Sequence, residues 1–162
     1  MSGGGPISGP RVVERRDSDW GGLLDLWVEA WRHTYGDIDF EARRDWLKDH
    51  IIRLERDGAR TLLLLEGAAR ALVGFVVIDP ASHWLDQLCV RPDRFGSGAA
   101  EALLEAARSL SPARIRLDVN QDNERAIAFY RREGFVRVAE GEPSLSGRPT
   151  LIMEWSSAAP SG

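Results

Sequence analysis

Residues 90–104 read VRPDRFGSGAAEALL, and this stretch says most about the fold. The apolar run before Pro92 is typical of a strand and the residues after Gly98 are typical of a helix, so a glycine-rich turn joins the two. Such a turn presents free backbone N–H groups at the positive end of a helix dipole, which suits a phosphate or pyrophosphate. Gly96 and Gly98 leave no Cβ between the main chain and a ligand. Because an isolated Gly-x-Gly is more often a simple tight turn, this stretch alone indicates only a candidate phosphate site.

A second stretch, residues 117–135, reads LDVNQDNERAIAFYRREGF and combines a strand, a helix start and a further strand. Together the two stretches closely resemble the GCN5-related N-acetyltransferase (GNAT) family. The family pattern is a strand ending in VxP, a turn (Q/R)xxGx(G/A), a helix with paired leucines, and then NxxAxxFYxxxGF. The positions that match it are Val90, Pro92, Gly98, Ala100, Leu103, Leu104, Asn123, Ala126, Phe129, Tyr130, Gly134 and Phe135. The resemblance is strong over residues 84–138 and rests on element order elsewhere.

The resemblance implies acetyl-CoA as the cofactor. In the family, successive amides of the turn hold the CoA pyrophosphate, and the preceding strand pairs with the pantetheine arm through main-chain groups. The cofactor-binding residues that it implies are Leu88, Cys89, Val90, Arg94, Phe95, Gly96, Ser97, Gly98, Ala99, Ala100, Asn123 and Tyr130. The sequence departs from the pattern at Phe95, where the family usually has Gln or Arg. Backbone amides do most of the anion binding, and Arg94 is placed to supply charge from the adjacent position.

Two residues are candidates for acid–base catalysis. Tyr130 matches the family's general acid, since a phenol of pKa about 10 can protonate a thiolate whose conjugate thiol has a pKa of about 8.5. Packing beside Phe129 is the alternative for this side chain. Asp86 lies in the strand WLDQLCV, where alternation places it on one face with Leu88 and Val90, and family members often carry an acidic residue there that takes the amine proton. A structural hydrogen bond explains Asp86 equally well.

Two further side chains lie close to these candidates in the sequence. Cys89 neighbours the thioester position, but an acyl-cysteine is not the family's usual route, so we expect a buried, inert thiol. His83 could serve as an auxiliary base, because histidine is the usual base near neutral pH, although an exposed turn residue is the simpler interpretation.

The acceptor pocket is bordered in the family by the first two helices and their connection. The substrate-binding candidates are therefore Trp31, Tyr35, Asp37 and Asp39, together with Asp86. The two aromatic residues also lie on the apolar stripe of a helix, which makes them core residues by default. The acidic residues favour a cationic amine, and the aromatic residues favour an acceptor with an apolar portion.

Apolar spacing predicts the remaining elements. The predicted strands are 11–16, 61–65, 71–78, 84–90, 115–119, 135–138 and 150–155, and the predicted helices are 20–35, 40–57, 98–110 and 123–133. The order βααβββαβαββ indicates an α/β (α+β) chain with the GNAT fold, in which a mixed, mostly antiparallel central sheet has helices on both faces.

Composition limits the classes of protein to consider. With 162 residues the chain has room for a single domain, predicted at 11–156, between disordered tails at 1–10 and 157–162 that are rich in Gly, Ser and Pro. No apolar run approaches the ~20 residues of a membrane span and the N-terminus lacks signal-peptide features, so we expect a cytoplasmic protein without a membrane partner. The formal net charge of −4 argues against a nucleic-acid partner. One cysteine and three scattered histidines predict no metal site.

We therefore expect an acetyl-CoA-dependent N-acetyltransferase that acts on a primary amine of a small molecule or of a peptide or protein N-terminus, by direct attack in a ternary complex. The alternative is a catalytically silent CoA-binding sensor or interaction module of the same fold, favoured if Phe95 plugs the pyrophosphate groove. A different nucleotide-binding enzyme is disfavoured, because the chain has neither a GxGxxG at its first strand–helix junction nor a GxxxxGK(S/T). The acceptor and the oligomeric state stay open, although family members often form homodimers.

Overall fold

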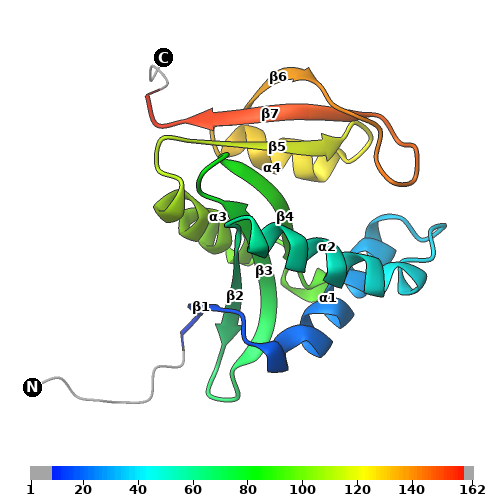
Figure 1. Ribbon diagram of the computed structural model, residues 1–162, viewed down its shortest axis with the longest axis vertical. Helices are drawn as coiled ribbons and strands as arrows, with labels where there is room; N and C mark the ends of the chain where they lie inside the picture. Colours follow the sequence, from blue (N-terminus) through cyan, green and yellow to red (C-terminus); the bar gives the residue numbers. More distant parts are fainter. Residues whose placement is uncertain (1–8, 159–162) are drawn as a thin grey trace, which may run out of the picture.

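The computed structural model describes residues 9–158, which form seven strands and four α-helices (Figure 1). In chain order these are β1 (Arg11–Glu14), α1 (Trp20–Thr34), α2 (Arg44–Arg56), β2 (Arg60–Glu66), β3 (Ala71–Asp79), β4 (Trp84–Val90), α3 (Ala99–Leu110), β5 (Arg114–Asn120), α4 (Glu124–Arg132), β6 (Val136–Glu140) and β7 (Thr150–Ser156). Short 3₁₀ turns precede α1, α2 and α3. The predicted order βααβββαβαββ is confirmed.

The strands form one sheet in the order β1-β2-β3-β4-β5-β7-β6. Every neighbouring pair is antiparallel except β4 and β5, so the mixed, mostly antiparallel sheet is confirmed. Within residues 9–158, β4 and β5 share a single residue pair, Trp84 with Arg116, and the two strands diverge beyond it. Figure 1 shows the result, with β5, β7 and β6 lying apart from the sheet portion formed by β1 to β4. Main-chain groups of β4 that face this opening have no strand partner there and need another one.

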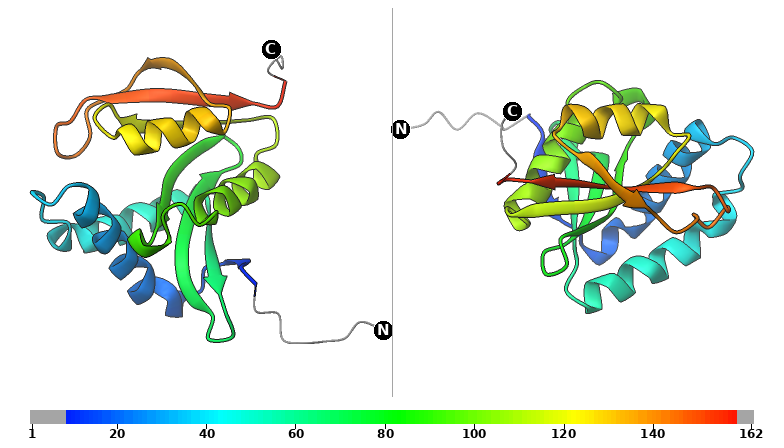
Figure 2. Two further views of the ribbon diagram at one scale, coloured as in Figure 1. Left: turned by 180° about the vertical axis from the view of Figure 1, so that it is seen from behind. Right: turned by 90° about the horizontal axis from the view of Figure 1, so that it is seen from above.

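Helices cover both faces of the sheet, as predicted (Figure 2). The amphipathic stripes of α1 and α2 pack on one face and those of α3 and α4 on the other, each burying its apolar side. The core on the first side includes Leu23, Trp27, Leu47, Ile51, Phe75 and Val77. The core on the second side includes Val76, Leu103, Leu104, Ile115, Ile127 and Phe135.

A glycine in β3 lets α3 approach the sheet closely. A Cβ at Gly74 would lie 2.6 Å from the carbonyl oxygen of Cys89 and 2.8 Å from Cδ1 of Leu103. Contacts this short are excluded for real side chains, so the absence of a side chain at Gly74 sets the depth at which α3 packs. The close packing fixes the position of the helix start that follows the glycine-rich turn.

The pairing of β3 with β4 contains a bulge at Asp86. Leu85 and Gln87 pair with adjacent residues of β3, which leaves Asp86 as the extra residue on β4. The predicted alternation of Asp86 with Leu88 and Val90 is therefore wrong, because the extra residue resets the alternation. Leu85, Leu88 and Val90 instead all contact the core on the α3 and α4 side.

The remaining differences concern element ends. The second helix begins at Arg44 rather than near residue 40, because residues 41–43 form a tighter 3₁₀ turn. The predicted tails, residues 1–10 and 157–162, lie largely outside the described residues. No helix among residues 9–158 is long and apolar enough to cross a membrane.

Candidate active site

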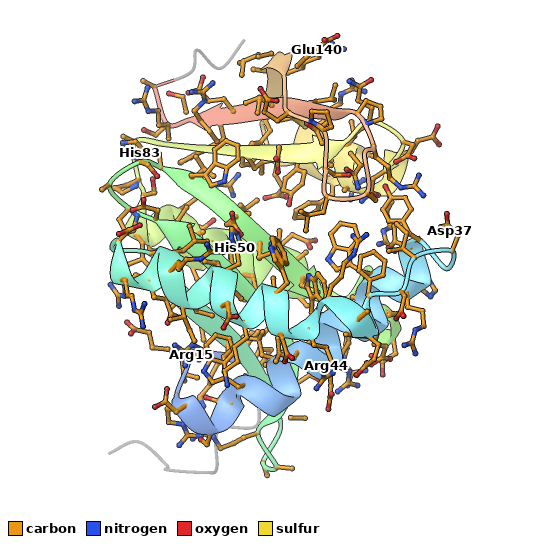
Figure 3. The ribbon with its side chains drawn as sticks, turned by 45° about the vertical axis from the view of Figure 1, so that its right-hand side comes forward. Arg15, Asp37, Arg44, His50, His83 and Glu140 are labelled. Atoms are coloured by element: carbon orange, nitrogen blue, oxygen red, sulfur yellow. The ribbon has the colours of Figure 1, made fainter. Side chains whose placement is uncertain are left out.

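A cavity of about 530 Å³ lies where β4 and β5 diverge. Figure 3 looks onto this region from the α2 side, with His50 near its centre. The lining residues from the α1 and α2 side include Trp27, Trp31, Phe40, Trp46 and His50. Those from the α3 and α4 side include Ala100, Asn123, Arg125, Phe129 and Tyr130. Because both faces contribute, the cavity passes through the opening in the sheet, and two reactants can meet in it from opposite faces.

Phe95 and Gly96 of the glycine turn, residues 95–98, line this cavity, and the main chain of the turn fits a pyrophosphate. Gly96 and Gly98 have φ angles of 76° and 93°, a left-handed backbone that favours glycine. A Cβ at either position would meet nothing within 4 Å, so the space beside the main chain is open. Among residues 9–158 no acceptor takes the amide hydrogens of Gly96 and Gly98. Those of Ala99 and Ala100 are also free, because they belong to the unpaired first turn of α3.

The side chains of the turn are directed to other partners. Ser97 Oγ donates a hydrogen bond to the Arg94 carbonyl oxygen at 2.6 Å, and Arg94 Nη2 pairs with Glu66 Oε1 at 3.0 Å. Phe95 lines the cavity, and the rings of His33 and Phe95 pack in a T-shaped arrangement with their centroids 5.5 Å apart. The charge that Arg94 was expected to offer is thus largely neutralised by Glu66.

Most of the predicted cofactor-binding residues share this cavity. The structure places Leu88, Cys89, Val90, Arg94, Phe95, Gly96, Ala100, Asn123 and Tyr130 on its wall. Ser97, Gly98 and Ala99 are not part of the lining, so their contribution is limited to the main chain of the turn. Asn123 caps α4 by accepting a hydrogen bond from the amide of Ala126 at 3.3 Å, which leaves its side-chain NH₂ group available.

Cys89 is a buried free thiol, as predicted. Burial raises the pKa of this thiol well above its ordinary value, and the charge of Glu29 raises it further. A thiol that stays protonated is a poor nucleophile, so this geometry does not support an acyl-cysteine.

Tyr130 projects from α4 into the same cavity and is 8% exposed. Its hydroxyl has no hydrogen-bond partner within residues 9–158, yet its oxygen is not sealed in the core. Burial raises the pKa of Tyr130 above that of an ordinary phenol, and the nearby Asp118 and Cys89 raise it further. The ring is fixed by edge-on contacts to Phe129 and Phe135, both at 5.3 Å. The cavity therefore contains a firmly placed O–H group that is protonated and free to donate.

Asp86 is held by a partner that the sequence did not indicate. His50 Nε2 of α2 lies 2.8 Å from Asp86 Oδ2, and Gln87 Nε2 donates to the same oxygen at 3.1 Å. The His50 ring stacks on Trp46, with centroids 4.8 Å apart. Within the described part of the chain, Nδ1 of His50 and the second carboxylate oxygen of Asp86 have no hydrogen bond. The pair can therefore still present a free acceptor to the cavity.

A second carboxylate lines the cavity near this pair. Partial exclusion of water raises the pKa of Asp118 on β5, and repulsion from the Asp86 carboxylate raises it further. Asp86 and Asp118 are thus two neighbouring carboxylates at this end of the cavity.

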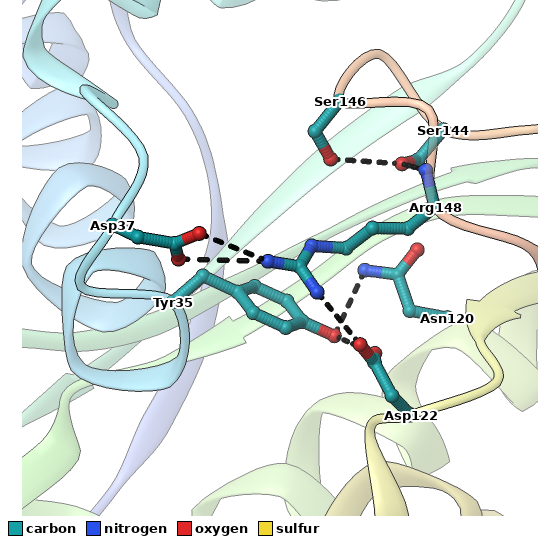
Figure 4. Close-up of polar contacts among 7 residues, drawn as sticks. All are labelled: Tyr35, Asp37, Asn120, Asp122, Ser144, Ser146 and Arg148. Carbon is teal, nitrogen blue, oxygen red and sulfur yellow. Dashed lines mark hydrogen bonds and ion pairs between the residues drawn. The ribbon is translucent and has the colours of Figure 1, made fainter.

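On the α1 side, five residues form a polar group that we call the Tyr35 cluster (Figure 4). The Tyr35 hydroxyl donates to Asp122 Oδ1 at 2.6 Å and accepts from Asn120 Nδ2 at 3.1 Å. The Arg148 guanidinium lies 4.2 Å from the Tyr35 ring centroid and pairs with Asp122 at 2.7 Å and with Asp37 at 3.4 Å. Burial, with help from Asp122, raises the pKa of Tyr35 to about 12. The Tyr35 and Arg148 bonds lower the pKa of Asp122.

The predicted substrate-binding residues separate into two groups. Trp31 and Tyr35 line the cavity, and the Trp31 ring stacks on Tyr35 at 5.8 Å and on Phe40 at 5.9 Å. Asp37 and Asp39 are not part of the lining: Asp37 pairs with Arg148, and Asp39 accepts the amide hydrogen of Ala42 at 3.2 Å. Contact of any of these side chains with a substrate stays a prediction.

His83, which the sequence suggested as an auxiliary base, is not a cavity residue. Its Nδ1 lies 2.8 Å from Ser111 Oγ in the turn before β4, and it has a φ of 66°. The described residues contain no group of three or more metal-ligating side chains.

Sequence reasoning missed His50, Trp46, Asp118 and Arg125. Trp46 and His50 are four residues apart, a spacing that places both on one side of a helix, but it does not show what that side faces. Asp118 and Arg125 lie inside the second motif, yet neither is one of its matching positions.

Comparison with known proteins gives a consistent result. The model of the acetyltransferase (GNAT) family matches residues 20–135. The peptidyl-lysine N-acetyltransferase YjaB of Escherichia coli is 34% identical over 81 residues, which cover 50% of this chain and 53% of the relative. A second Escherichia coli protein, the peptidyl-lysine N-acetyltransferase YiaC, is 29% identical over 150 residues, covering 89% of this chain and 95% of the relative. The match to YjaB thus spans about half of that protein's length.

Among solved structures, the PaiA N-acetyltransferase of Thermoplasma acidophilum in complex with coenzyme A superposes with a TM-score of 0.73. The superposition covers 91% of this chain and 99% of the other, at 21% sequence identity. At this identity the likeness supports the fold alone.

Proposed function

The chain belongs to the acetyltransferase (GNAT) family, and we propose that it transfers an acetyl group from acetyl-CoA to a primary amine in a ternary complex. One observation carries the proposal. A single cavity through the opening between β4 and β5 joins the free amides of the glycine turn, the unpartnered hydroxyl of Tyr130 and the Asp86–His50 pair. These are the groups that acyl transfer to an amine requires: an anion site, an acid and a base.

The cofactor, when bound, supplies an acetyl thioester whose carbonyl carbon the amine attacks and whose thiolate departs. The glycine turn would hold its pyrophosphate through the amides of Gly96, Gly98, Ala99 and Ala100. The edge of β4 that faces the opening would pair with the pantetheine amides, and a β4 N–H would polarise the thioester carbonyl. In a closed sheet these main-chain groups of β4 would bond to β5, whereas the opening leaves them available to the cofactor.

Tyr130 would protonate the departing thiolate. Its raised pKa keeps the phenol protonated at neutral and mildly alkaline pH, and its hydroxyl has no competing partner among the described residues. A protonated donor that is already in place costs little reorganisation during the reaction.

Asp86 would take the proton that the amine loses as it attacks, directly or through a water molecule. His50 would position the Asp86 carboxylate through the 2.8 Å bond, since the stack on Trp46 limits the motion of the imidazole. The bulge at Asp86 supports this role, because an extra residue in a strand redirects a side chain away from the regular sheet pattern.

The acceptor that fits best is a cationic primary amine on an apolar chain. Asp86 and Asp118 attract the charge, and the rings of Trp31 and Trp46 line the path with apolar surface. A lysine side chain has these properties, and the relatives YjaB and YiaC are named as peptidyl-lysine N-acetyltransferases. We therefore propose a lysine side chain of a peptide, or a small amine of similar shape, as the acceptor class. A cytoplasmic location, a single domain over 11–156, a homodimer and the absence of a nucleic-acid partner stay predictions.

Thiol release by the full chain tests the proposal. Acetyl-CoA is supplied with peptides that carry one internal lysine, peptides with only a free N-terminus, and polyamines, and the products are identified by mass spectrometry. We expect release that depends on an amine, with a mass gain of one acetyl group on the lysine peptides. CoA binding without turnover on any amine would contradict the proposed acetyltransferase activity and favour a silent CoA-binding module. Failure of the chain to bind CoA would contradict the assignment of acetyl-CoA as the cofactor.

A further inference from the structure

One face of α4 carries two arginines to the cavity wall. Arg125, Phe129 and Arg132 are spaced by four and three residues, so they share one side of the helix, and all three line the cavity. Neither arginine forms an ion pair within residues 9–158. Unpaired cations on a cavity wall are available to an anionic ligand.

Arg125 has a defined seat beside the glycine turn. Its guanidinium carbon lies 3.6 Å from the centroid of the Phe95 ring, and its Nη2 is 3.5 Å from Thr34 Oγ1. His33 packs edge-on against the same Phe95 ring at 5.5 Å. The aromatic face attracts the cation and leaves the edge of the guanidinium, with its N–H donors, directed away from the ring.

Other arginines near the turn are already paired. Arg94 binds Glu66 at 3.0 Å, and Arg91 binds Asp93 at 2.7 Å. Arg125 therefore differs from these two arginines, because it lines the cavity and has no acidic partner among the described residues. Burial lowers the pKa of Arg125 from its ordinary value, because part of the water shell around the charge is removed.

We propose that Arg125, seated on Phe95, is the cationic side chain that binds the pyrophosphate of the cofactor together with the amides of the glycine turn. The inference rests on the proposed function and adds to it a residue and a role. Phe95 is the positioning residue, because it fixes the guanidinium beside the free amides of Gly96 and Gly98. A phosphate oxygen there would accept bonds from the main chain and from a guanidinium at the same time, which is the strongest combination available to it.

Direct binding measurements separate this proposal from its alternatives. The dissociation constants of CoA, 3′-dephospho-CoA and pantetheine are measured by calorimetry on the wild-type chain and on Arg125→Gln. Arg131→Gln is the matched control, because Arg131 lies on the same helix but does not line the cavity. We expect Arg125→Gln to weaken CoA and 3′-dephospho-CoA about tenfold or more and to leave pantetheine unchanged, while the control changes none of the three.

Each other result overturns the proposal in a different way. A loss that disappears with 3′-dephospho-CoA would assign Arg125 to the 3′-phosphate. An equal loss with pantetheine would show that the substitution disturbs the cavity itself. No loss with any ligand would show that Arg125 does not bind the cofactor. Failure of the wild-type chain to bind CoA would instead contradict the proposed function, so the two failures are distinguishable.

The positioning role of Phe95 has its own test. Phe95→Leu keeps an apolar side chain and removes the aromatic face. This substitution should therefore weaken CoA binding, but by less than Arg125→Gln does. The two substitutions should be non-additive, because each disrupts the same contact. Full additivity would overturn the role of Phe95 as the seat, and the melting temperatures of both variants show whether they are folded.

Discussion

The two ends of the cavity are built in different ways. The cofactor end consists mainly of a strand, a turn and a helix start that follow one another between residues 84 and 104, and its donors, apart from the guanidinium of Arg125, are main-chain amides. The acceptor end consists of side chains brought together from distant segments. His50 bonds to Asp86 across 36 positions, Tyr35 to Asp122 across 87, and Arg148 to Asp37 across 111.

This difference shows which part of the site tolerates change. Main-chain donors depend on backbone conformation and are lost when the turn changes shape, whatever the surrounding side chains are. Side-chain contacts between distant segments can be replaced one at a time, and each replacement alters the shape of the acceptor end without affecting the turn. We therefore expect substitutions at the two ends to act on different kinetic constants.

Tyr130→Phe should have the largest effect, because Tyr130 lies where the two ends meet. The substitution removes the donated proton and keeps the ring, so kcat should fall by on the order of 10²-fold with little change in CoA affinity. Because the pKa of Tyr130 is raised, this acid should stay protonated, and its deprotonation should cause no fall in wild-type kcat up to about pH 10. Steady-state kinetics and CoA calorimetry on the same preparation check both statements. Unchanged turnover at every pH would show that water or another group protonates the thiolate.

Asp86→Asn tests the acceptor end. If the carboxylate takes the amine proton, kcat/KM should fall roughly 10- to 100-fold on the acidic side, where unprotonated amine is scarce. The loss should shrink as pH rises toward the pKa of the amine, because bulk solvent then removes the proton. His50→Gln keeps Asp86 and removes its partner, so it should give a smaller loss with the same pH trend.

A structural carboxylate predicts a different outcome for Asp86→Asn. The melting temperature would fall because a half-buried hydrogen bond changes, while activity per folded molecule would stay nearly constant. A loss of activity that is independent of pH would contradict the general base and leave Asp86 as an orienting group.

The cofactor end was the more predictable of the two from the sequence, for a physical reason. Glycines in a left-handed conformation, an unpaired helix start and a buried strand each leave a local pattern, so residues 84–104 indicated the turn and its strand to within one residue. The bulge at Asp86 left no such pattern, because it depends on how β4 pairs with β3. A single extra residue therefore invalidated the expected alternation.

The acceptor end could not be assembled from the sequence. Nothing in the segment around His50 indicates that its helix faces Asp86, and nothing near Arg148 indicates a bond to Asp37. These contacts follow from the packing of α1, α2 and the β6–β7 connection against the sheet. The helix stripes predicted which faces are buried, but polar pairs at the edges of those faces depend on register and on the length of the connections.

Two glycines in similar conformations allow a direct comparison of the ends. Gly98 in the turn and Gly147 before β7 have φ angles of 93° and 79°, and a Cβ at either meets nothing within 4 Å. Gly98→Val should raise KM for acetyl-CoA about tenfold, because a branched side chain strains the turn and blocks the main chain. Gly147→Val imposes similar strain at the acceptor end and should change only KM for the amine. Equal effects of both variants on acetyl-CoA would contradict the separation of the two ends.

The smallest expected effect concerns the stability of the Tyr35 cluster. Tyr35→Phe removes the bonds to Asp122 and from Asn120, so the free energy of unfolding at neutral pH should fall by about 1–2 kcal/mol.

The pKa of Tyr35 is raised from about 10 in an unfolded chain to about 12 in the folded one. A raised pKa means that the contribution of Tyr35 is fully present below about pH 10 and is lost as the pH rises through about 12. The difference in stability between wild type and Tyr35→Phe, measured by urea unfolding, should therefore be constant up to about pH 10 and then shrink. Few other side chains titrate in this pH range, because the only lysine is Lys48, the only other tyrosine is Tyr130 and arginines stay charged. A difference that stays flat to pH 12 would show that the Tyr35 hydroxyl contributes little to closing the acceptor end, and would leave Arg148 as the main connection there.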